Sequence, residues 1–250
     1  MAGVNLLLVI PARFESSRFP GKPLADLHGS PLIKHVWNRC CHAVDATDVV
    51  VATDDERIAS VASDFGAIVE MTSTDCLTGT DRVAEVASRR DADWYVNVQG
   101  DEPLIDPKSI LEVIHRARTE PEGTLALNAM SPIRVESDFR STSVPKVVTD
   151  HSDFLLYISR APIPTDKQHR FSFGWRQVGL YAYRPQALNY FSPDSNKRAL
   201  EALEDIEILR LLENGKPVRM IRVPEASPAV DTPDDLERVR QIMLEQGIAQ

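Results

Sequence analysis

Three cationic side chains stand in the loop that follows the first apolar run of the chain. They are Arg13, Arg18 and Lys22, with small residues, Pro and Gly between them. The apolar run at 6–10 is short and bounded by turn residues, which predicts a buried strand. A loop at the carboxyl end of such a strand lies where α/β sheets bind ligands, and its cations and N–H groups can neutralise phosphate oxygens. The segment predicts a polyphosphate site, although three cations alone fit a solvated loop equally well.

This loop matches neither of the two common glycine-rich phosphate motifs. It contains no G-x-x-x-x-G-K-[ST] and no G-x-G-x-x-G, so neither the P-loop nor the dinucleotide-binding mechanism is supported. Phosphate binding here would depend on the cationic side chains.

Two acidic residues far apart in the chain are candidate metal ligands. Asp101 comes shortly after a predicted strand at 94–98, and Asp231 precedes a helix whose cap, at 232–235, accounts for its neighbours but not for Asp231 itself. Mg²⁺ is commonly bound through one or two carboxylates together with phosphate oxygens. The pair therefore predicts a Mg²⁺ site facing the cationic loop. The alternatives are a turn-stabilising Asp before a Pro for Asp101 and a solvated loop carboxylate for Asp231.

Two further turns carry hydroxyl and acidic residues at the start of a helix. The segment 78–82, Thr78-Gly79-Thr80-Asp81-Arg82, has small hydroxyl residues and N–H groups that can contact a base or a phosphate. A plain capping segment is the alternative. The segment 53–55 is better explained by capping and by the helix dipole alone.

Strand and helix patterns alternate along the first half of the chain. The predicted strands are at 6–10, 49–52, 67–71 and 94–98, and the predicted helices at 32–41, 56–65 and 82–89. Repeated β-α-β order with short links indicates an α/β fold with a mostly parallel, Rossmann-like, doubly wound sheet.

The second half is less regular. Turn residues mix with strand patterns at 146–148, 154–158 and 178–183, which predicts an insertion at about 131–195 in a single domain spanning 1–250. One helix is predicted over 199–214, with an apolar stripe, followed by a strand at 218–223 and a helix at 233–245.

Composition limits the possible functions. The 250 residues are 43% hydrophobic, enough for a full core, and the formal net charge of −9 disfavours a protein that coats nucleic acid. No run approaches the roughly 20 apolar residues of a membrane helix, and the first apolar run lacks the charged flank of a signal peptide. The three cysteines form no C-x-x-C, which indicates a reducing, cytoplasmic compartment.

Taken together and in order, ten short motifs resemble those of the 3-deoxy-manno-octulosonate cytidylyltransferases, the CMP-KDO synthetases. The similarity covers nearly the whole chain, and the set is specific although each motif alone is weak. The motifs begin at Ile10, Ser17, Pro20, Val51, Met71, Gly79, Asn97, Ser159, Gly179 and Val230.

The resemblance implies the transfer of CMP from CTP to the anomeric hydroxyl of a 2-keto-3-deoxy sugar acid, with release of pyrophosphate, for cell-surface polysaccharide. It also implies Mg²⁺ as cofactor and a cytoplasmic homodimer whose inserted subdomain serves dimerisation and sugar binding, with no nucleic-acid or membrane partner. In-line attack on the α-phosphorus fits this site, since phosphoryl-type transfer needs positioning and charge neutralisation.

The resemblance also assigns roles to single residues. Arg13, Lys22 and Asp101 would be the catalytic residues, and Asp101 and Asp231 would bind the metal. The nucleotide would be bound by Ala12, Arg13, Arg18, Lys22, Thr78, Gly79, Thr80, Arg82 and Gln99. The sugar acid would be bound by Arg160, Gln177, Tyr181 and Glu207. For Arg160, Tyr181 and Glu207 the alternatives are an ion pair at a strand end, a packed aromatic ring and a solvated helix face.

Two positions on the sugar side depart from the family pattern. Gln177 stands where the family usually has His, and Ile208 follows Glu207 where the family usually has Gln. A site built for one pattern of hydroxyls and amines can reject an analogue strongly, so a modified ulosonic acid is an alternative to KDO. Two other functions stay open: an acylneuraminate-type or other sugar nucleotidyltransferase, and a non-catalytic protein that binds a nucleotide sugar.

Overall fold

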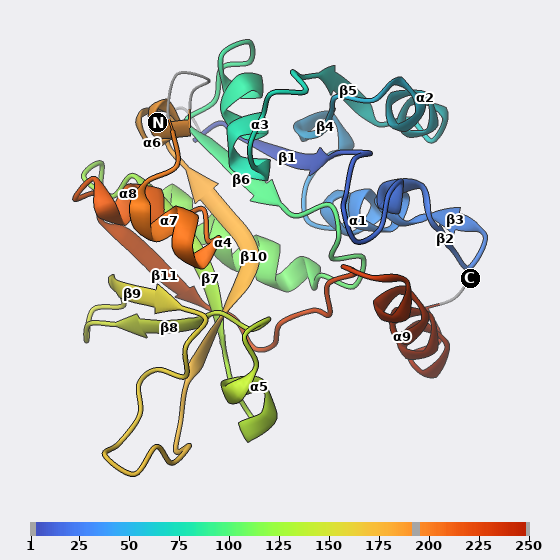
Figure 1. Ribbon diagram of the computed structural model, residues 1–250. Coiled ribbons are helices and arrows are strands. Elements are labelled where there is room, and N and C mark those ends of the chain that lie inside the picture. Colours follow the sequence, from blue (N-terminus) through green and yellow to red (C-terminus); the bar gives the residue numbers. More distant parts are fainter. Residues whose placement is uncertain (1–3, 192–195, 249–250) are drawn as a thin grey trace.

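A mixed β-sheet runs through the computed structural model, which describes residues 4–191 and 196–248 (Figure 1). The strands are β1 (Leu6–Ala12), β2 (Asp26–Leu27), β3 (Ser30–Pro31), β4 (Val49–Thr53), β5 (Ile68–Met71), β6 (Trp94–Val98), β7 (Ala126–Pro132), β8 (Lys146–Thr149), β9 (Leu155–Ser159), β10 (Trp175–Tyr183) and β11 (Val218–Arg222). The main sheet has the order β11-β7-β10-β6-β1-β4-β5, and β8 and β9 extend it from β10. Only β10 among the strands of this order is antiparallel to its neighbours in the described chain.

Helices cover both faces of this sheet. They are α1 (Leu32–Cys41), α2 (Glu56–Asp64), α3 (Gly79–Ala87), α4 (Pro107–Thr119), α5 (Glu136–Arg140), α6 (Pro185–Leu188), α7 (Ala199–Glu204), α8 (Leu209–Glu213) and α9 (Pro233–Glu245). In the part of the chain that the structure covers, no helix has both the length and the apolar character of a membrane span.

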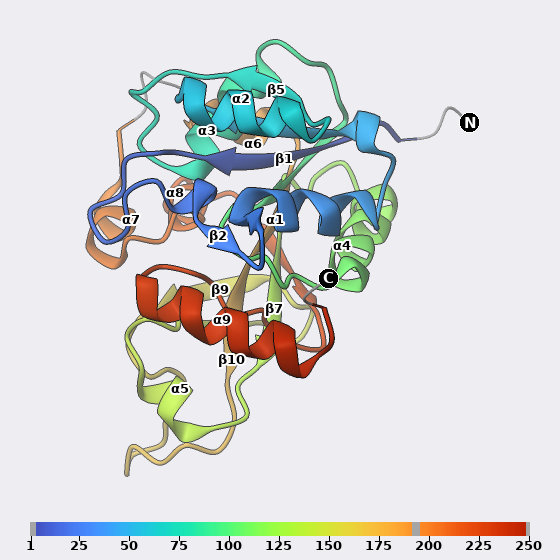
Figure 2. The ribbon, with the colours of Figure 1, turned by 90° about the vertical axis from the view of Figure 1, so that its right-hand side faces the viewer.

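The side chains of strand β1 show why helices must cover both faces of the sheet. Its side chains alternate between two hydrophobic clusters: Leu8 and Ile10 pack with α1, α4 and α9, whereas Leu7 and Val9 pack with α3, α6 and α8. Figure 2 shows α1 and α3 on opposite sides of β1. A strand buried on both faces needs a continuous apolar run, as the sequence has here. The predicted Rossmann-like, doubly wound and mostly parallel sheet is confirmed.

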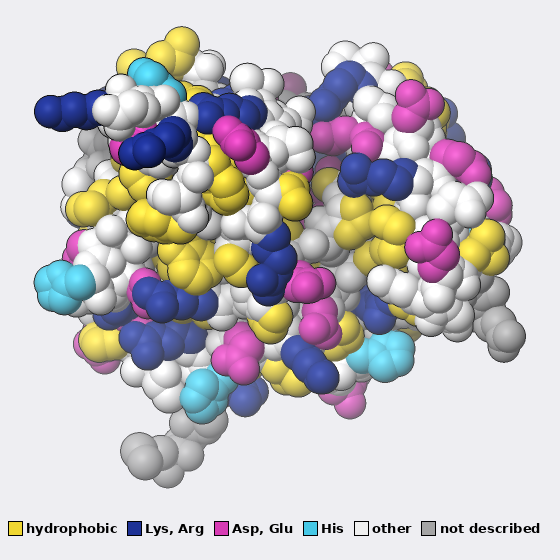
Figure 3. All heavy atoms as spheres, turned by 90° about the horizontal axis from the view of Figure 1, so that it is seen from below, with side chains coloured by type: hydrophobic (Ala, Val, Ile, Leu, Met, Phe, Trp, Pro, Cys, Tyr) yellow, Lys and Arg dark blue, Asp and Glu magenta, His cyan; other side chains and the backbone are white. Residues whose placement is uncertain are grey.

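The strand directions place several chain segments at one edge of the sheet. β1, β4 and β6 are parallel, so their carboxyl ends meet there. β10 runs the other way beside β6, with Leu180 opposite Val98, which brings its Gly179 end to the same edge. Ligands of open α/β sheets bind beyond this edge. Seen from below (Figure 3), the surface is hollowed between two halves, with cationic and acidic side chains interspersed.

Most predicted elements are present, with three differences. α3 begins at Gly79 rather than at residue 82, because Thr78 caps it by accepting a hydrogen bond from the Asp81 N–H. Helix α4 and strand β7 were not predicted, although α4 carries apolar residues at helical spacing; β7 contains the buried polar residues Asn128 and Ser131. The short elements β2, β3, α5 and α6 were not predicted either.

The third difference is a correction: the single helix predicted over 199–214 is wrong. The structure has two short helices, α7 and α8, because Asp205 adopts a left-handed conformation with φ 52°. The Arg160 guanidinium donates hydrogen bonds to the carbonyl oxygens of Glu204 and Asp205 at this break, which replaces the lost helical partners. Leu203, one of the apolar residues at helical spacing that led to the prediction of a single helix, is 81% exposed.

Strands β8 and β9 and the chain that joins β9 to β10 project from the main sheet (Figure 1). β10 itself lies between β6 and β7 within that sheet. The boundary of a subdomain at about 131–195, and its role in dimerisation and sugar binding, stay predictions.

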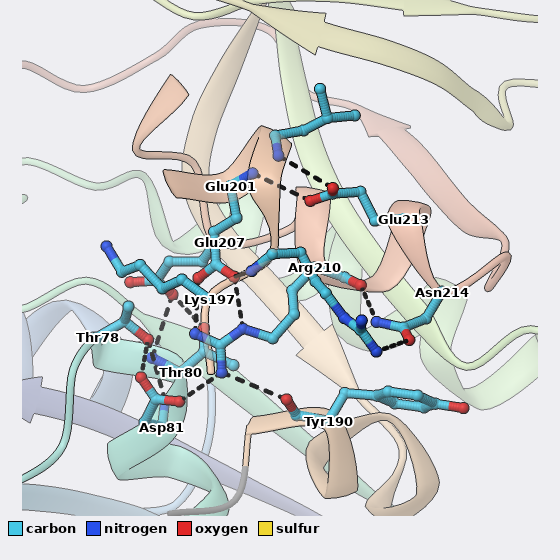
Figure 4. A network of polar contacts seen from close by, with 12 residues as sticks. Thr78, Thr80, Asp81, Tyr190, Lys197, Glu201, Glu207, Arg210, Glu213 and Asn214 are labelled. Atoms are coloured by element: carbon cyan, nitrogen blue, oxygen red, sulfur yellow. Dashed lines mark hydrogen bonds and ion pairs between the residues drawn. The ribbon is translucent and has the colours of Figure 1, made fainter. Parts of the chain in front are cut away.

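A buried ionic network fixes α7 and α8 to the start of α3 (Figure 4). The Arg210 guanidinium lies 2.8 Å from Asp81 Oδ1 and 2.6 Å from both carboxylate oxygens of Glu201. The Arg210 side chain is 1% exposed. Such a pair need not stabilise a fold more than apolar packing, but removal of one partner leaves buried charges uncompensated.

We therefore expect Arg210→Met to lower the free energy of unfolding by about 3–5 kcal/mol, since Asp81 and Glu201 would keep their charges without this partner. Urea denaturation followed by circular dichroism measures the change. The control is Arg140→Met, because Arg140 pairs with Glu136 at the surface and such pairs contribute little. Equal stability of the two variants would contradict the structural role of Arg210.

Candidate functional site

A cavity at the carboxyl edge of the sheet brings together most of the residues that the sequence singled out. It is lined by five parts of the chain: the loop after β1, the residues that lead into α3, the turn after β6, the residues on either side of α7, and the chain between β11 and α9. The predicted site residues among its lining are Ala12, Arg13, Arg18, Lys22, Thr78, Gly79, Arg82, Gln99, Asp101, Glu207 and Asp231. Thr80, Arg160, Gln177 and Tyr181 are not among the lining residues.

At one side of the cavity, Asp101 and Asp231 share one ammonium group. Lys22 Nζ lies 2.8 Å from Asp101 Oδ2 and 3.6 Å from Asp231 Oδ1. Arg18 Nη2 lies 3.1 Å from the same Asp231 oxygen. Two carboxylates distant in sequence and two of the three loop cations thus form one charged cluster.

The loop after β1 is shaped to present Lys22 to these carboxylates. The Gly21 N–H donates to the Phe14 carbonyl oxygen at 2.8 Å, which closes the loop, and Gly21 has φ 69°. A Cβ at this position would lie 3.0 Å from the Phe14 ring. Glycine is therefore required for the backbone conformation and for the close approach. A short 3₁₀ turn, Lys22–Leu24, begins directly after it.

The turn after β6 and the segment before α9 are joined by backbone. The Val230 N–H donates to the Asp101 carbonyl oxygen at 2.9 Å, so Asp231 follows a residue that is bonded to Asp101. The turn also packs tightly on β1, because a Cβ at Gly100 would lie 2.5 Å from the Pro11 carbonyl oxygen. Backbone contacts thus bring the two carboxylates together.

The residue after Asp101 is a buried acid that was not predicted as functional. Glu102 accepts a hydrogen bond from the Gly179 N–H at 3.1 Å and another from the Ser227 hydroxyl. Burial raises the pKa of Glu102 to about 7, against the opposing effect of the Ser227 hydrogen bond. The only signal in the sequence was the charge next to Asp101, and its partners lie too far along the chain to be inferred.

The start of α3 is occupied by a carboxylate of the protein. The N–H groups of Gly79 and Thr80 donate to Glu207 at 3.1 and 3.2 Å, and the Thr80 hydroxyl contacts the same carboxylate. An acidic side chain at a helix start is stabilised by the dipole and the free N–H groups. Burial raises the pKa of Glu207 while these hydrogen bonds lower it. Thr80 lies behind the cavity wall, where its hydroxyl is 3.2 Å from the Tyr183 hydroxyl.

Arg82 lies at the cavity wall with its charge balanced by the protein. Its Nη2 is 2.9 Å from Asp54 Oδ2, and the Arg82 side chain is 3% exposed. Asp55 caps α2 by accepting the Arg57 N–H, as the capping interpretation of 53–55 predicted, but Asp54 instead serves as the partner of Arg82.

The other three candidates for the sugar acid, like Glu207, contact other parts of the protein. The Arg160 guanidinium donates to backbone carbonyl oxygens, including that of Thr142 at 2.9 Å. The Gln177 amide donates to Asn128 Oδ1 at 2.9 Å. Tyr181 is buried and stacks on Tyr183 with ring centroids 5.9 Å apart. Of the predicted sugar residues, only Glu207 lines the cavity, and the roles of all four stay predictions.

The charged cluster suits a divalent cation that is bound together with phosphate. In the described ranges, no three His, Cys, Asp or Glu side chains converge as a complete metal-binding set. Mg²⁺ does not require such a set, because it readily takes one or two carboxylates and fills its other positions with water and phosphate oxygens. The ammonium that Asp101 and Asp231 share shows that this position accepts a positive charge.

Comparisons with known proteins agree with this geometry. The family model described as cytidylyltransferase matches residues 7–220. A 3-deoxy-manno-octulosonate cytidylyltransferase of Geobacter sulfurreducens is 48% identical over 94% of this chain and 98% of that protein. One of Syntrophotalea carbinolica is 46% identical over 94% of this chain and 97% of that protein.

A solved structure of CMP:2-keto-3-deoxy-manno-octonic acid synthetase complexed with CTP superposes with a TM-score of 0.90 at 37% sequence identity, covering 97% of this chain and 99% of that one. Sequence, fold and family model agree along nearly the full chain. This chain belongs to the 3-deoxy-manno-octulosonate cytidylyltransferase family.

Proposed function

We propose that the protein transfers CMP from CTP to the anomeric hydroxyl of a 2-keto-3-deoxy sugar acid and releases pyrophosphate. The observation that carries the proposal is the meeting of Asp101 and Asp231 over Lys22, inside a cavity that the cationic loop also lines. The curated relatives, at up to 48% identity, carry the corresponding name. The product would supply the synthesis of cell-surface polysaccharide.

The cationic loop would hold the triphosphate. Arg13, Arg18 and Lys22 line the cavity, and their charges would neutralise the oxygens of the leaving pyrophosphate as the sugar hydroxyl attacks the α-phosphorus in line. Asp101 and Asp231 would hold Mg²⁺, which when bound supplies further charge neutralisation and fixes the phosphates in place. The protein's main contribution is to align the reactants, so no covalent intermediate with the enzyme is needed.

The segment that leads into α3 would face the nucleoside. Thr78 and Gly79 line the same cavity as the acidic pair, and Glu207 holds the Gly79 backbone in place. Because the N–H groups of Gly79 and Thr80 already donate to Glu207, and the Thr78 carbonyl oxygen accepts from the Arg82 N–H, contacts to the base from this segment would come from other atoms.

The residues at which this chain differs from the family pattern are predicted to be on the side of the sugar acid. We propose KDO as the reference acceptor, from the names of the relatives. An amino or deoxy variant of KDO is the second candidate, because Gln177 is engaged with Asn128 and Ile208 is fully buried in the apolar core. Neither side chain reproduces the contacts that His and Gln would offer at these positions.

We also propose a homodimer in the cytoplasm. The three most exposed large apolar side chains of the described residues are Leu156 on β9, 58% exposed, Phe173 before β10, 61% exposed, and Leu203 on α7, 81% exposed. Burial of such side chains against a second copy removes apolar surface from water. The three cysteines are free thiols, which suits a reducing compartment.

Asp101→Asn should reduce pyrophosphate release from CTP and KDO by at least about 10³-fold, since loss of the charge removes a cation ligand at the reacting phosphates. The fold should be retained, as judged by circular dichroism. Asp234→Asn, at an exposed position on α9, is the matched control and should keep wild-type turnover. Wild-type turnover in Asp101→Asn would remove the metal assignment.

A pyrophosphate assay with each nucleoside triphosphate and a panel of acids tests the substrates. We expect release with CTP and an eight-carbon ulosonic acid, and at least about 100-fold lower kcat/KM with other triphosphates. The acid panel contains KDO, its amino and deoxy variants, and nine-carbon acids. Preference for a nine-carbon acid would indicate an acylneuraminate-type enzyme, and CTP binding without release for any acid would indicate a non-catalytic binding protein.

Light scattering after gel filtration tests the dimer. The expected mass is twice the chain mass of 27.9 kDa. Leu203→Glu should shift the protein toward the monomer, because a charge would have to be buried at the interface. Leu244→Glu, on α9 at the other side of the view in Figure 1, is the control and should stay dimeric. A monomeric wild type would contradict the proposal.

A further inference from the structure

The segment that carries Asp231 is a connection with little regular structure. It leaves β11 after Arg222 and reaches α9 at Pro233, and it crosses the edge of the sheet beside the turn that holds Asp101. Two hydrogen bonds join the segment to that turn: Val230 N–H to the Asp101 carbonyl oxygen, and the Ser227 hydroxyl to the Glu102 carboxylate. The position of Asp231 relative to Asp101 therefore depends on contacts between distant parts of the chain.

Glu102 lies where three segments meet. One carboxylate oxygen accepts from the Gly179 N–H of β10 at 3.1 Å, and the other accepts from Ser227. A Cβ on Gly179 would lie 2.3 Å from the Glu102 carboxylate, so the approach depends on glycine. Glu102 is 6% exposed and does not line the cavity. It acts on the turn, on β10 and on the 224–231 segment, and not on the substrate.

The 224–231 segment is not packed tightly on the side that faces α9. A second hollow lies there, lined by residues of the segment itself and by Leu104, Asp106 and Ile242. Close packing would hold a connection in place without specific hydrogen bonds, but a hollow leaves room for displacement. The position of the 224–231 segment therefore depends more on the hydrogen bond from Ser227 to Glu102 than it would in a closely packed core.

Burial of the Glu102 carboxylate is unfavourable in free energy unless its oxygens are hydrogen-bonded. Taking a charged group out of water is unfavourable unless strong hydrogen bonds compensate it. Two donors aimed at the two oxygens of Glu102 provide such bonds. The arrangement suits a residue that must fix two neighbours at once.

We propose that Glu102 is a positioning residue. It holds the Asp231 carboxylate close enough to Asp101 for both to bind the same divalent cation. It does so by holding the 224–231 segment through Ser227 and the turn after β6 through its own backbone. The proposal rests on the proposed function in one respect, since the cation is the one assigned to Asp101 and Asp231.

The test uses Mn²⁺ as the probe with the full chain and CTP. Ser227→Ala removes the bond to Glu102 and leaves every cavity residue unchanged. We expect the Mn²⁺ dissociation constant, measured by electron paramagnetic resonance, to rise about tenfold, as for loss of a hydrogen bond to a charged group. Amide hydrogen exchange should become faster in residues 224–231 and stay unchanged in the strands. In kinetics, KM for Mg²⁺ should rise more than kcat falls.

Two further variants separate positioning from general damage. Glu102→Gln retains an oxygen for the Gly179 N–H and an amide that can donate to Ser227, so it should keep Mn²⁺ affinity within about threefold of wild type, as expected for a conservative change that preserves both bonds. Ser63→Ala, at an exposed position on α2, is the matched control and should behave as wild type.

The outcomes distinguish this proposal from the function on which it rests. Wild-type Mn²⁺ affinity in Ser227→Ala, together with loss of affinity in Asp101→Asn, overturns the positioning role alone. Weaker affinity in Ser227→Ala with unchanged exchange at 224–231 also overturns it, because the effect would not come from the segment. Unchanged affinity in Asp101→Asn would instead overturn the metal site of the proposed function.

Discussion

Two carboxylates of like charge are held against one cavity wall, and their repulsion must be balanced for the fold to keep them there. Asp101 follows β6 and Asp231 lies between β11 and α9, and the Lys22 ammonium, at 2.8 and 3.6 Å, is their shared counter-charge. Coulomb attraction at such distances is substantial in a partly buried site. The Gly21 turn, the Val230 to Asp101 backbone bond and the buried Glu102 all determine where these charges lie. The proposed nucleotide chemistry at this edge would depend on that balance.

The proposed nucleotide side and sugar side of the site differ in how many of their predicted residues line the cavity. Cations, carboxylates and the start of α3 already line the cavity that the nucleotide would enter. On the sugar side, Arg160 stabilises the break between α7 and α8, so its contribution to the site is at least partly structural. This chain also departs from its family on that side, at Gln177 on β10 and at the buried Ile208.

Sequence patterns predicted the sheet, the cationic loop and the two acidic segments because each of these is a local feature. A buried strand followed by turn residues is recognisable in a short window, and the carboxyl ends of parallel strands converge by geometry alone. The break at Asp205 could not be predicted, since it depends on Arg160, a residue far away in the chain. The same holds for Glu102 and for the capping of α3 by Glu207, whose partners are brought near only by the tertiary fold. The apolar stripe over 199–214 was misleading, because periodicity does not show which apolar side chains face solvent.

The most direct test of the central claim is a crystal structure with CTP and Mn²⁺, using anomalous scattering to locate the metal. The account predicts a Mn²⁺ peak within coordination distance, roughly 2.0–2.3 Å, of both an Asp101 and an Asp231 oxygen and of a phosphate oxygen, with Lys22 moved to the triphosphate. A metal bound to phosphate alone, or to residues outside the cluster of Asp101, Asp231 and Lys22, would contradict it.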